Sequence, residues 1–197
     1  MQFADIIGQK ETKQQLAELV QHNRLSHALL FLGKEGSGSL SLAIAFAQYV
    51  VCEKVNGGKS GVGSQESGPS LFGEPENSNV EPPTLNDSCG VCPACQKAQQ
   101  LIHPDIHFSY PTVTKKPGEK PVATDFITDW REFVKLSPYG NSYDWIEQIK
   151  EKENRQGKIT AEECNDIIRK LSLKSFESVY KILIMWMPEM LGTEGNK

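Results

Sequence analysis

The sequence predicts an α/β fold, with a parallel sheet that is covered by helices on both faces, together with a small zinc-binding module. Three observations lead to this prediction. Short apolar runs that suit buried strands alternate with segments of helical periodicity. A Gly-rich loop joins the first apolar run to a helix, and three cysteines lie close together at 89–95. With 197 residues, the chain is long enough for one domain with a sizeable core.

Composition narrows the classes of protein to which the chain can belong. The formal net charge is −4, so any contact with DNA is expected to be local or to come through a partner. No apolar run reaches the length of about 18 residues that a transmembrane helix needs. The start of the chain, MQFAD, lacks the features of a signal peptide. We therefore expect a cytoplasmic protein, in a compartment where clustered cysteines favour metal over disulfides.

The first part of the chain predicts a helix, a strand, a loop and a second helix. Apolar residues at helical spacing predict helices over 9–24 and 40–52. The continuous apolar run over 28–32 has the length of a buried strand. The Gly-rich loop therefore joins a strand to a helix, which is the context of a phosphate-binding loop.

Residues 53–88 differ from their surroundings, since 20 of these 36 residues are Gly, Ser, Pro or Asn. Such a segment cannot bury enough apolar area to offset the entropy of ordering it. We predict a flexible insertion at 53–88, inside a zinc module that spans 52–95.

The second half of the chain predicts further helices and two strands. Thr160 and Glu163 have the spacing of a capping box, in which each side chain bonds the other residue's backbone N–H. The apolar run over 180–187 predicts a strand that is buried on both faces. The apolar face of the helix after Thr160 is expected to carry Cys164, Ile167, Ile168 and Leu171. Other helices are predicted over 96–102, 125–136 and 142–153, a strand over 106–110, and a loop over 115–120.

The cysteine cluster carries the clearest chemical signal. Cys89, Cys92 and Cys95 are spaced so that their thiolates can converge on one ion, and structural zinc takes four ligands, often all sulfur. We favour Cys52 over His103 as the fourth ligand, because Cys52 ends the predicted helix from which the insertion leaves. Closing the long loop costs only about 0.6 kcal/mol of free energy per doubling of its length. Binding of structural zinc contributes roughly 10 kcal/mol or more, which outweighs this cost. An iron–sulfur cluster and free core thiols are the alternatives. The full set of candidates for the fourth ligand is Cys52, Cys164, His103 and His107.

The Gly-rich loop has the glycines of a phosphate-binding loop but not its reactive side chains. Gly33, Gly36 and Gly38 allow the backbone to wrap around phosphates. A working loop then needs a Lys for the phosphates and a Ser or Thr hydroxyl for magnesium. Ser39 and Leu40 occupy these two positions. We therefore predict a degenerate phosphate loop formed by Gly33, Gly36, Gly38 and Ser39, with no catalytic residue and with ATP absent or weakly bound.

Further stretches of the sequence share a pattern with known proteins. These are FADIIGQ at 3–9, RLSHALLF at 24–31, the cysteine cluster followed by HPD at 103–105, and the segment 159–184. Together they resemble the AAA+ clamp-loader family of bacterial DNA replication, over nearly the whole chain apart from the insertion. The resemblance implies a RecA-like AAA+ domain over 1–197, with a zinc module. It also implies that the chain stops before the helical lid, the helical collar and the arginine finger of that family.

The family contains two subunit types, and the resemblance implies the one that does not hydrolyse ATP. Motor subunits of the gamma/tau type need an intact phosphate loop and an acidic pair for magnesium. The positions of that pair fall on Met185 and Trp186, so this chain resembles the delta-prime type. Its implied partners are gamma/tau-type and delta-type subunits of DNA polymerase III, with the sliding clamp and primed DNA reached through the complex. An active gamma/tau-like ATPase and a zinc-based nucleic-acid-binding module are the alternatives.

Overall fold

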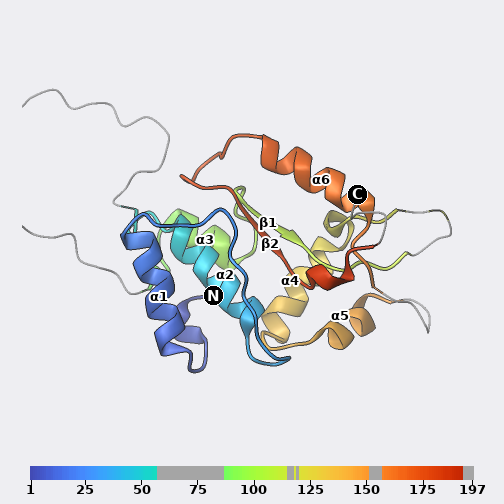
Figure 1. The fold of residues 1–197 in the computed structure, drawn as a ribbon, viewed down its shortest axis with the longest axis horizontal. Helices are drawn as coiled ribbons and strands as arrows, with labels where there is room; N and C mark the ends of the chain where they lie inside the picture. Colours follow the sequence, from blue (N-terminus) through green and yellow to red (C-terminus); the bar gives the residue numbers. More distant parts are fainter. Residues whose placement is uncertain (57–86, 115–117, 119, 151–156, 193–197) are drawn as a thin grey trace, which may run out of the picture.

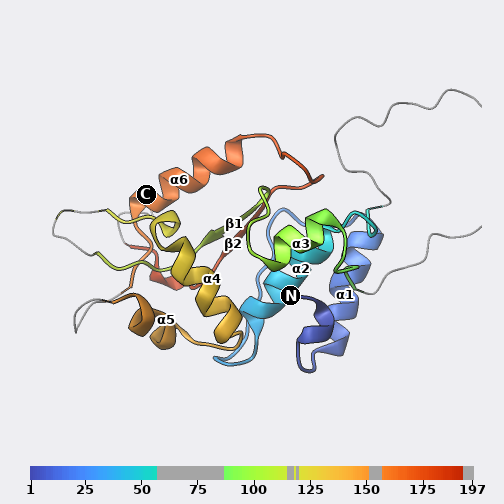
Figure 2. The ribbon, with the colours of Figure 1, turned by 180° about the vertical axis from the view of Figure 1, so that it is seen from behind.

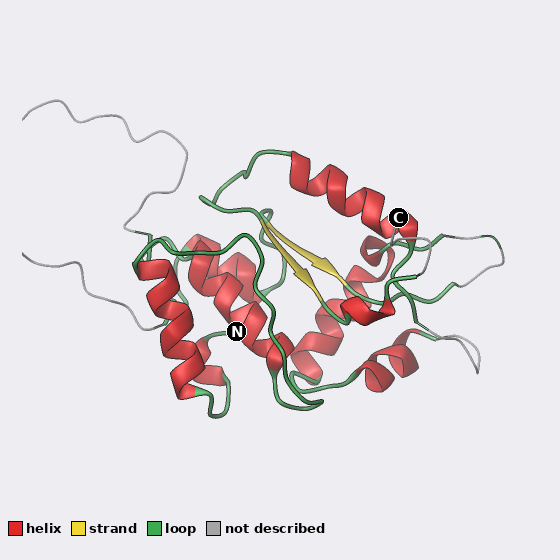
Figure 3. Cartoon of the chain, in the orientation of Figure 1, coloured by secondary structure: helices red, strands yellow, loops and turns green. Residues whose placement is uncertain are grey.

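The structure, a computed structural model, describes residues 1–56, 87–114, 118, 120–150 and 157–192. Most of the predicted insertion and of the predicted loop at 115–120 lies outside these residues, as does the end of the helix predicted over 142–153. No helix in the described part is long and apolar enough to cross a membrane. The elements along the chain are η1 (Phe3–Asp5), α1 (Lys10–Gln21), α2 (Ser39–Val51), α3 (Pro93–Gln99), β1 (Ile106–Ser109), η2 (Ala123–Phe126), α4 (Ile127–Leu136), α5 (Ser142–Ile149), α6 (Ala161–Ser172), β2 (Ile182–Met185) and the 3₁₀ turn η3 (Pro188–Met190) (Figures 1 and 3).

Strands β1 and β2 form a parallel pair at the centre of the molecule. Ile106 lies opposite Ile182, and the register continues to Ser109 opposite Met185. This pairing confirms the two strands predicted in the second half of the chain and the parallel sheet of an α/β fold. In Figures 1 and 2, α6 lies on one side of the pair, and α4 and α5 lie on the other.

The strand predicted over 28–32 is wrong. This segment connects α1 to α2 without strand pairing, and Leu30 and Leu32 are 80% and 88% exposed. Phe31 does pack inward, with its ring centroid 6.1 Å from that of Phe46. The other four residues of the run are exposed, so the apolar run predicted neither the burial of this segment nor a partner for its backbone groups. In the described residues β1 is the only strand that pairs with β2, and β2 is mostly half-buried, not buried on both faces as predicted.

The predicted helices are present, with shifted ends. Helix α3 begins at Pro93, three residues before the predicted start, because the Cys92 sulfur accepts the N–H of Cys95 and caps the helix. Proline suits the first helical position, where its missing N–H has no helical partner to lose. The helix predicted over 125–136 begins as the 3₁₀ turn η2 and continues as α4.

Helix α6 starts at the predicted cap but does not form the whole predicted capping box. The Thr160 hydroxyl accepts the N–H of Glu163 at 3.2 Å. Glu163 is buried, and its Oε2 accepts the N–H of Ala123 at 2.7 Å, which ties α6 to η2. The predicted apolar face is only partly buried, since Ile167 is buried while Ile168 is 67% exposed.

Helix α2 lies in the middle of the hydrophobic core. One of its sides packs into the cluster that contains β1, α3 and α4, and another packs against η1 and α1. This burial explains why its sequence, SLSLAIAFAQYVV, has almost no polar face. The residues that it contributes to the two clusters are Ile44, Ala47 and Val51 in the first, and Leu42, Ala45, Phe46, Tyr49 and Val50 in the second.

Aromatic side chains fill the core between β1, β2, α4 and α5. The Tyr110 ring stacks on Trp130 with centroids 4.0 Å apart, and Trp145 meets Trp130 edge-on at 5.3 Å. Trp186, directly after β2, joins this group with centroids 5.5 Å from Trp130 and 5.6 Å from Phe133. Trp186 is therefore a core residue.

Asp105 fixes the chain that leads into β2. Its side chain is buried, and its oxygens accept the backbone N–H groups of Phe176, Glu177 and Ser178 at 2.6, 2.7 and 2.8 Å. Burial alone would raise the pKa of Asp105, but these three donors outweigh it and the pKa is lowered. The Asp105 carbonyl also accepts the N–H of Ile182 at 2.8 Å, which sets the start of the β1–β2 pairing.

We expect Asp105→Asn to lower the free energy of unfolding by roughly 2–4 kcal/mol, because an amide cannot accept all three charge-assisted bonds. Urea denaturation at neutral pH measures this loss. Asp144→Asn is the matched control, since the exposed Asp144 carboxylate accepts one backbone bond, from Asn141. The control should cost under about 1 kcal/mol. Equal losses in the two variants would contradict the role of Asp105.

Candidate functional site

Four cysteines from two distant parts of the chain come together. Cys52 directly follows α2, while Cys89, Cys92 and Cys95 lie at the start of α3. Their four Sγ atoms all lie within 4.8 Å of one another, and those of Cys89 and Cys95 are 3.9 Å apart. A tetrahedral zinc ion with Zn–S bonds of about 2.3 Å places its sulfurs about 3.8 Å apart. The group therefore has the composition and nearly the size of a four-thiolate metal site.

Backbone N–H groups point at three of the sulfurs. Cys89 donates to Cys52 Sγ, Cys92 donates to Cys89 Sγ, and Cys95 donates to Cys92 Sγ, each at 3.4 Å. The contact with Cys95 lowers the pKa of Cys52, whereas burial raises the pKa of Cys92. The N–H donors favour thiolate, the form that binds metal. Four protein ligands would complete the coordination of zinc, so such a site would be structural.

The other candidate ligands lie apart from this group. His103 Nδ1 accepts the N–H of Asp105 at 3.1 Å, and burial lowers the pKa of His103. His107 lies on β1 and Cys164 on α6. In the described residues, none of the three belongs to the group around Cys52 whose atoms could hold a metal ion.

The amino-terminal segment is tied to the chain just before Cys89. The Asp87 carboxylate accepts the N–H groups of Phe3 and Ala4 at 3.0 and 2.9 Å. Gln2 Nε2 donates to the Ser88 carbonyl at 2.5 Å. The first residues of the chain therefore support the turn that presents the cysteines.

Gln48 on α2 completes this support. It is buried, its Nε2 donates to Ser88 Oγ at 3.0 Å, and its Oε1 accepts the Met1 ammonium at 2.9 Å. Sequence analysis missed Asp87, Ser88 and Gln48. It assigned Asp87 and Ser88 to the flexible insertion on composition, and hydrogen bonds between residues 40 or 84 positions apart leave no local pattern in the sequence.

The glycines of the Gly-rich loop have backbone roles. Gly36 and Gly38 have φ of +73° and +79°, in the left-handed region that favours glycine. A Cβ atom on Gly33 would overlap the Ser37 hydroxyl. The loop therefore needs glycine to turn into α2, whether or not it binds phosphate.

The side chains at the positions where a nucleotide site would carry its reactive groups lie in helix α2 and at the end of β2. Ser39 and Leu40 form the start of α2, and Leu40 packs partly against the core. Lys34 is exposed, in the turn before the helix. Met185 ends β2, and Trp186 belongs to the aromatic core. The positions expected for the lysine, the hydroxyl and the acidic pair therefore hold Ser39, Leu40, Met185 and Trp186.

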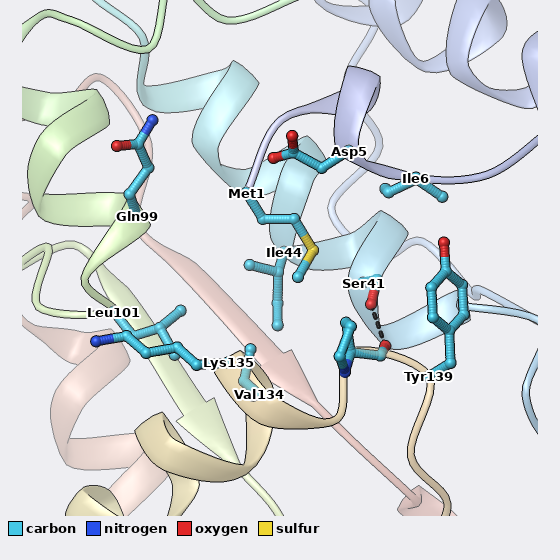
Figure 4. Close-up of a pocket in the computed structure, with 11 residues that line it drawn as sticks. Met1, Asp5, Ile6, Ser41, Ile44, Gln99, Leu101, Val134, Lys135 and Tyr139 are labelled. Carbon is cyan, nitrogen blue, oxygen red and sulfur yellow. Dashed lines mark hydrogen bonds between the residues drawn. The ribbon is translucent and has the colours of Figure 1, made fainter.

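A cavity of about 230 Å³ opens beside α2, between the amino-terminal segment and the end of α4 (Figure 4). Its lining is mainly apolar, with Ile6, Ile44 and Val134 among the residues that surround it. Pro138 and Tyr139, from the turn between α4 and α5, also line it. The cavity thus borders the turn that lies beside the first residues of α2.

Comparisons with known proteins bear on the resemblance described above. Residues 8–68 match the family described as "DNA polymerase III, delta subunit". Over 50 residues the chain is 44% identical to "DNA polymerase III subunit tau/gamma" of Haemophilus influenzae. This stretch is 25% of the chain and 7% of that relative, so the chain spans a small part of the relative's length. No solved structure matches the chain significantly. Both matches name subunits of DNA polymerase III, which supports a relation to the clamp-loader family.

We expect the purified chain to carry about one zinc ion, and Cys92→Ser to bring the zinc content well below half an equivalent after dialysis against a mild chelator. Metal analysis by mass spectrometry measures both values. Cys164→Ser is the matched control, because Cys164 lies outside the cluster, and it should keep its zinc. Equal zinc contents in the two variants, or iron in place of zinc, would contradict the prediction.

We expect Asp87→Asn to speed amide hydrogen exchange at residues 3 and 4 about tenfold, because the backbone donors lose a charged acceptor. Exchange followed by mass spectrometry of the amino-terminal peptide measures this effect. The zinc content should not change, since Asp87 is not part of the cysteine group. Asp125→Asn is the control, because the Asp125 carboxylate similarly accepts a backbone N–H, that of Val122 at the start of η2. Unchanged exchange in Asp87→Asn would show that the amino-terminal turn does not depend on this carboxylate.

Proposed function

We propose that this chain is a non-catalytic subunit of a DNA polymerase III clamp loader, of the delta-prime type. The observation that carries this proposal is the start of α2, where Ser39 and Leu40 follow the Gly-rich loop. The loop keeps the backbone geometry of glycine, but it lacks a lysine charge against a triphosphate and a hydroxyl for magnesium. Such a loop can support the fold without supporting ATP hydrolysis.

The position after β2 gives independent support. Trp186 packs against Trp130 and Phe133 in the aromatic core. An acidic residue in its place would bury a charge without a partner, which costs several kcal/mol, on the order of 3 or more. This part of the chain therefore stabilises the sheet where a motor subunit would hold magnesium.

The proposed role of the chain is to help assemble the clamp-loader complex. In this proposal, residues 1–197 supply a RecA-like AAA+ domain that lies beside ATP-hydrolysing gamma/tau-type subunits and a delta-type subunit. The complex opens the sliding clamp and places it on primed DNA. Cys52, Cys89, Cys92 and Cys95 hold zinc, which fixes the end of α2 to the start of α3. A net charge of −4 favours contact with protein subunits over direct DNA binding.

The similarity to a tau/gamma subunit favours a second candidate, an active ATPase with a divergent loop. That candidate requires ATP turnover by a chain with Ser39 and Leu40 at the start of α2. The two candidates therefore differ in one measurable activity.

We expect the isolated chain to show no ATP hydrolysis above the background of a mock purification, with or without primed DNA. Mixed with gamma/tau-type and delta-type subunits of the same organism, it should enter one complex on size-exclusion chromatography. The complex should load the clamp, and omission of the chain should abolish loading. Turnover that is lost in Gly38→Val would favour the second candidate, because a side chain at φ +79° would distort the loop.

Failure to enter the complex would reject the assembly role. The isolated chain also allows a test of the zinc-based nucleic-acid module. Salt-dependent DNA binding by the chain alone would favour that module over the assembly role.

A further inference from the structure

The turn between α4 and α5, residues 137–140, lies directly against the start of α2 (Figure 4). The Ser41 hydroxyl, in the first turn of α2, donates to the Pro138 carbonyl. A Cβ atom built on Gly38 would lie 2.7 Å from a ring carbon of Tyr139. The Tyr139 ring therefore covers the backbone of the last glycine of the loop.

Tyr139 also holds the amino-terminal segment. Its hydroxyl accepts the N–H of Ile7 at 2.9 Å. The Ile7 side chain is 81% exposed, so burial of that side chain does not fix the backbone here. Two residues further on, Gln9 Nε2 donates to the Ser37 carbonyl at 2.5 Å. The Gly-rich loop is thus held at Gly38 by the turn and at Ser37 by the amino-terminal segment.

These contacts restrict what the loop can do. A phosphate-binding loop presents the N–H groups of the first helical turn to its ligand, and its backbone adjusts around the phosphates. In this chain, a shift of Gly38 toward Tyr139 would cause a steric clash with the tyrosine ring. Movement of the amino-terminal segment breaks the bond between Ile7 and the tyrosine hydroxyl. The contacts at Gly38, Ser37 and Ile7 do not depend on which side chains occupy positions 39 and 40.

We propose that Pro138 and Tyr139 form a latch that holds the Gly-rich loop in a conformation closed to magnesium–triphosphate. The latch rests on the proposed function, in which this loop does not hydrolyse ATP, and it adds a second cause for that property. In this proposal Tyr139 is a positioning residue, because it acts on the loop and the amino-terminal segment. Restoring the lost side chains alone would not restore binding.

Four proteins test the latch: the unchanged chain, Ser39→Lys/Leu40→Ser, Tyr139→Ala, and the combination of all three substitutions. Isothermal titration calorimetry with MgATP measures the dissociation constant. We expect no binding below about 1 mM for the first three, and binding at least about tenfold tighter in the combination. Binding by Ser39→Lys/Leu40→Ser that equals the combination would overturn the proposal. Failure of the correctly folded combination to bind would also overturn it, because release of the latch would then not open the loop.

A second readout does not depend on new side chains. Tyr139→Phe removes only the hydroxyl that holds Ile7, and it should speed amide hydrogen exchange over 33–41 about tenfold. Tyr143→Phe is the matched control, since Tyr143 is 68% exposed on α5. Equal exchange in the two variants would overturn the latch.

The outcomes for the latch and for the proposed function can be told apart. ATP hydrolysis by the unchanged chain would reject the non-catalytic role. Comparison of Ser39→Lys/Leu40→Ser with the combination judges the latch alone, because both variants carry the same restored side chains.

Discussion

The burial of α2 on several sides is the constraint on which the rest of the structure depends. This helix has 13 residues, which makes it about 20 Å long. The Gly-rich loop leads into one end, and Cys52 follows the other. Both hydrophobic clusters of the described core pack on it, so α2 cannot shift without disturbing both. The loop and the cysteine group are thereby held at a fixed separation.

Features that depend on local spacing could be predicted from the sequence, and features that depend on distant partners could not. Periodicity located α1 and α2, and the C-x2-C-x2-C spacing located the cysteine group, which the structure joins to Cys52. The apolar run over 28–32 predicted a buried strand, whereas four of its five residues are exposed and the segment has no strand pairing within the described part of the chain. Glu163 matched a local capping pattern, yet its carboxylate bonds Ala123 on another element. Likewise, composition could not reveal that Asp87 would cap the amino-terminal turn.

The glycines of the Gly-rich loop can be explained by the fold alone. Its glycines satisfy backbone geometry at Gly36 and Gly38 and leave room for Ser37 beside Gly33. The turn into α2 alone requires glycine at these positions, whether or not a ligand is bound. At the positions where a nucleotide site would carry reactive side chains, Leu40 and Trp186 pack against the core. The glycines of the loop are therefore no evidence by themselves for a bound phosphate.

The bonds from Asp87 to Phe3 and Ala4 have a consequence for the order in which the protein folds during synthesis. The ribosome makes Phe3 long before Asp87, so the first turn lacks this acceptor while more than 80 further residues are added. Helix α2 also lacks two of its contacts at first, because Ser88 is made 40 residues after Gln48 and Cys89 is made 37 residues after Cys52. The beginning of the chain thus gains these contacts only once the cysteine turn has been made.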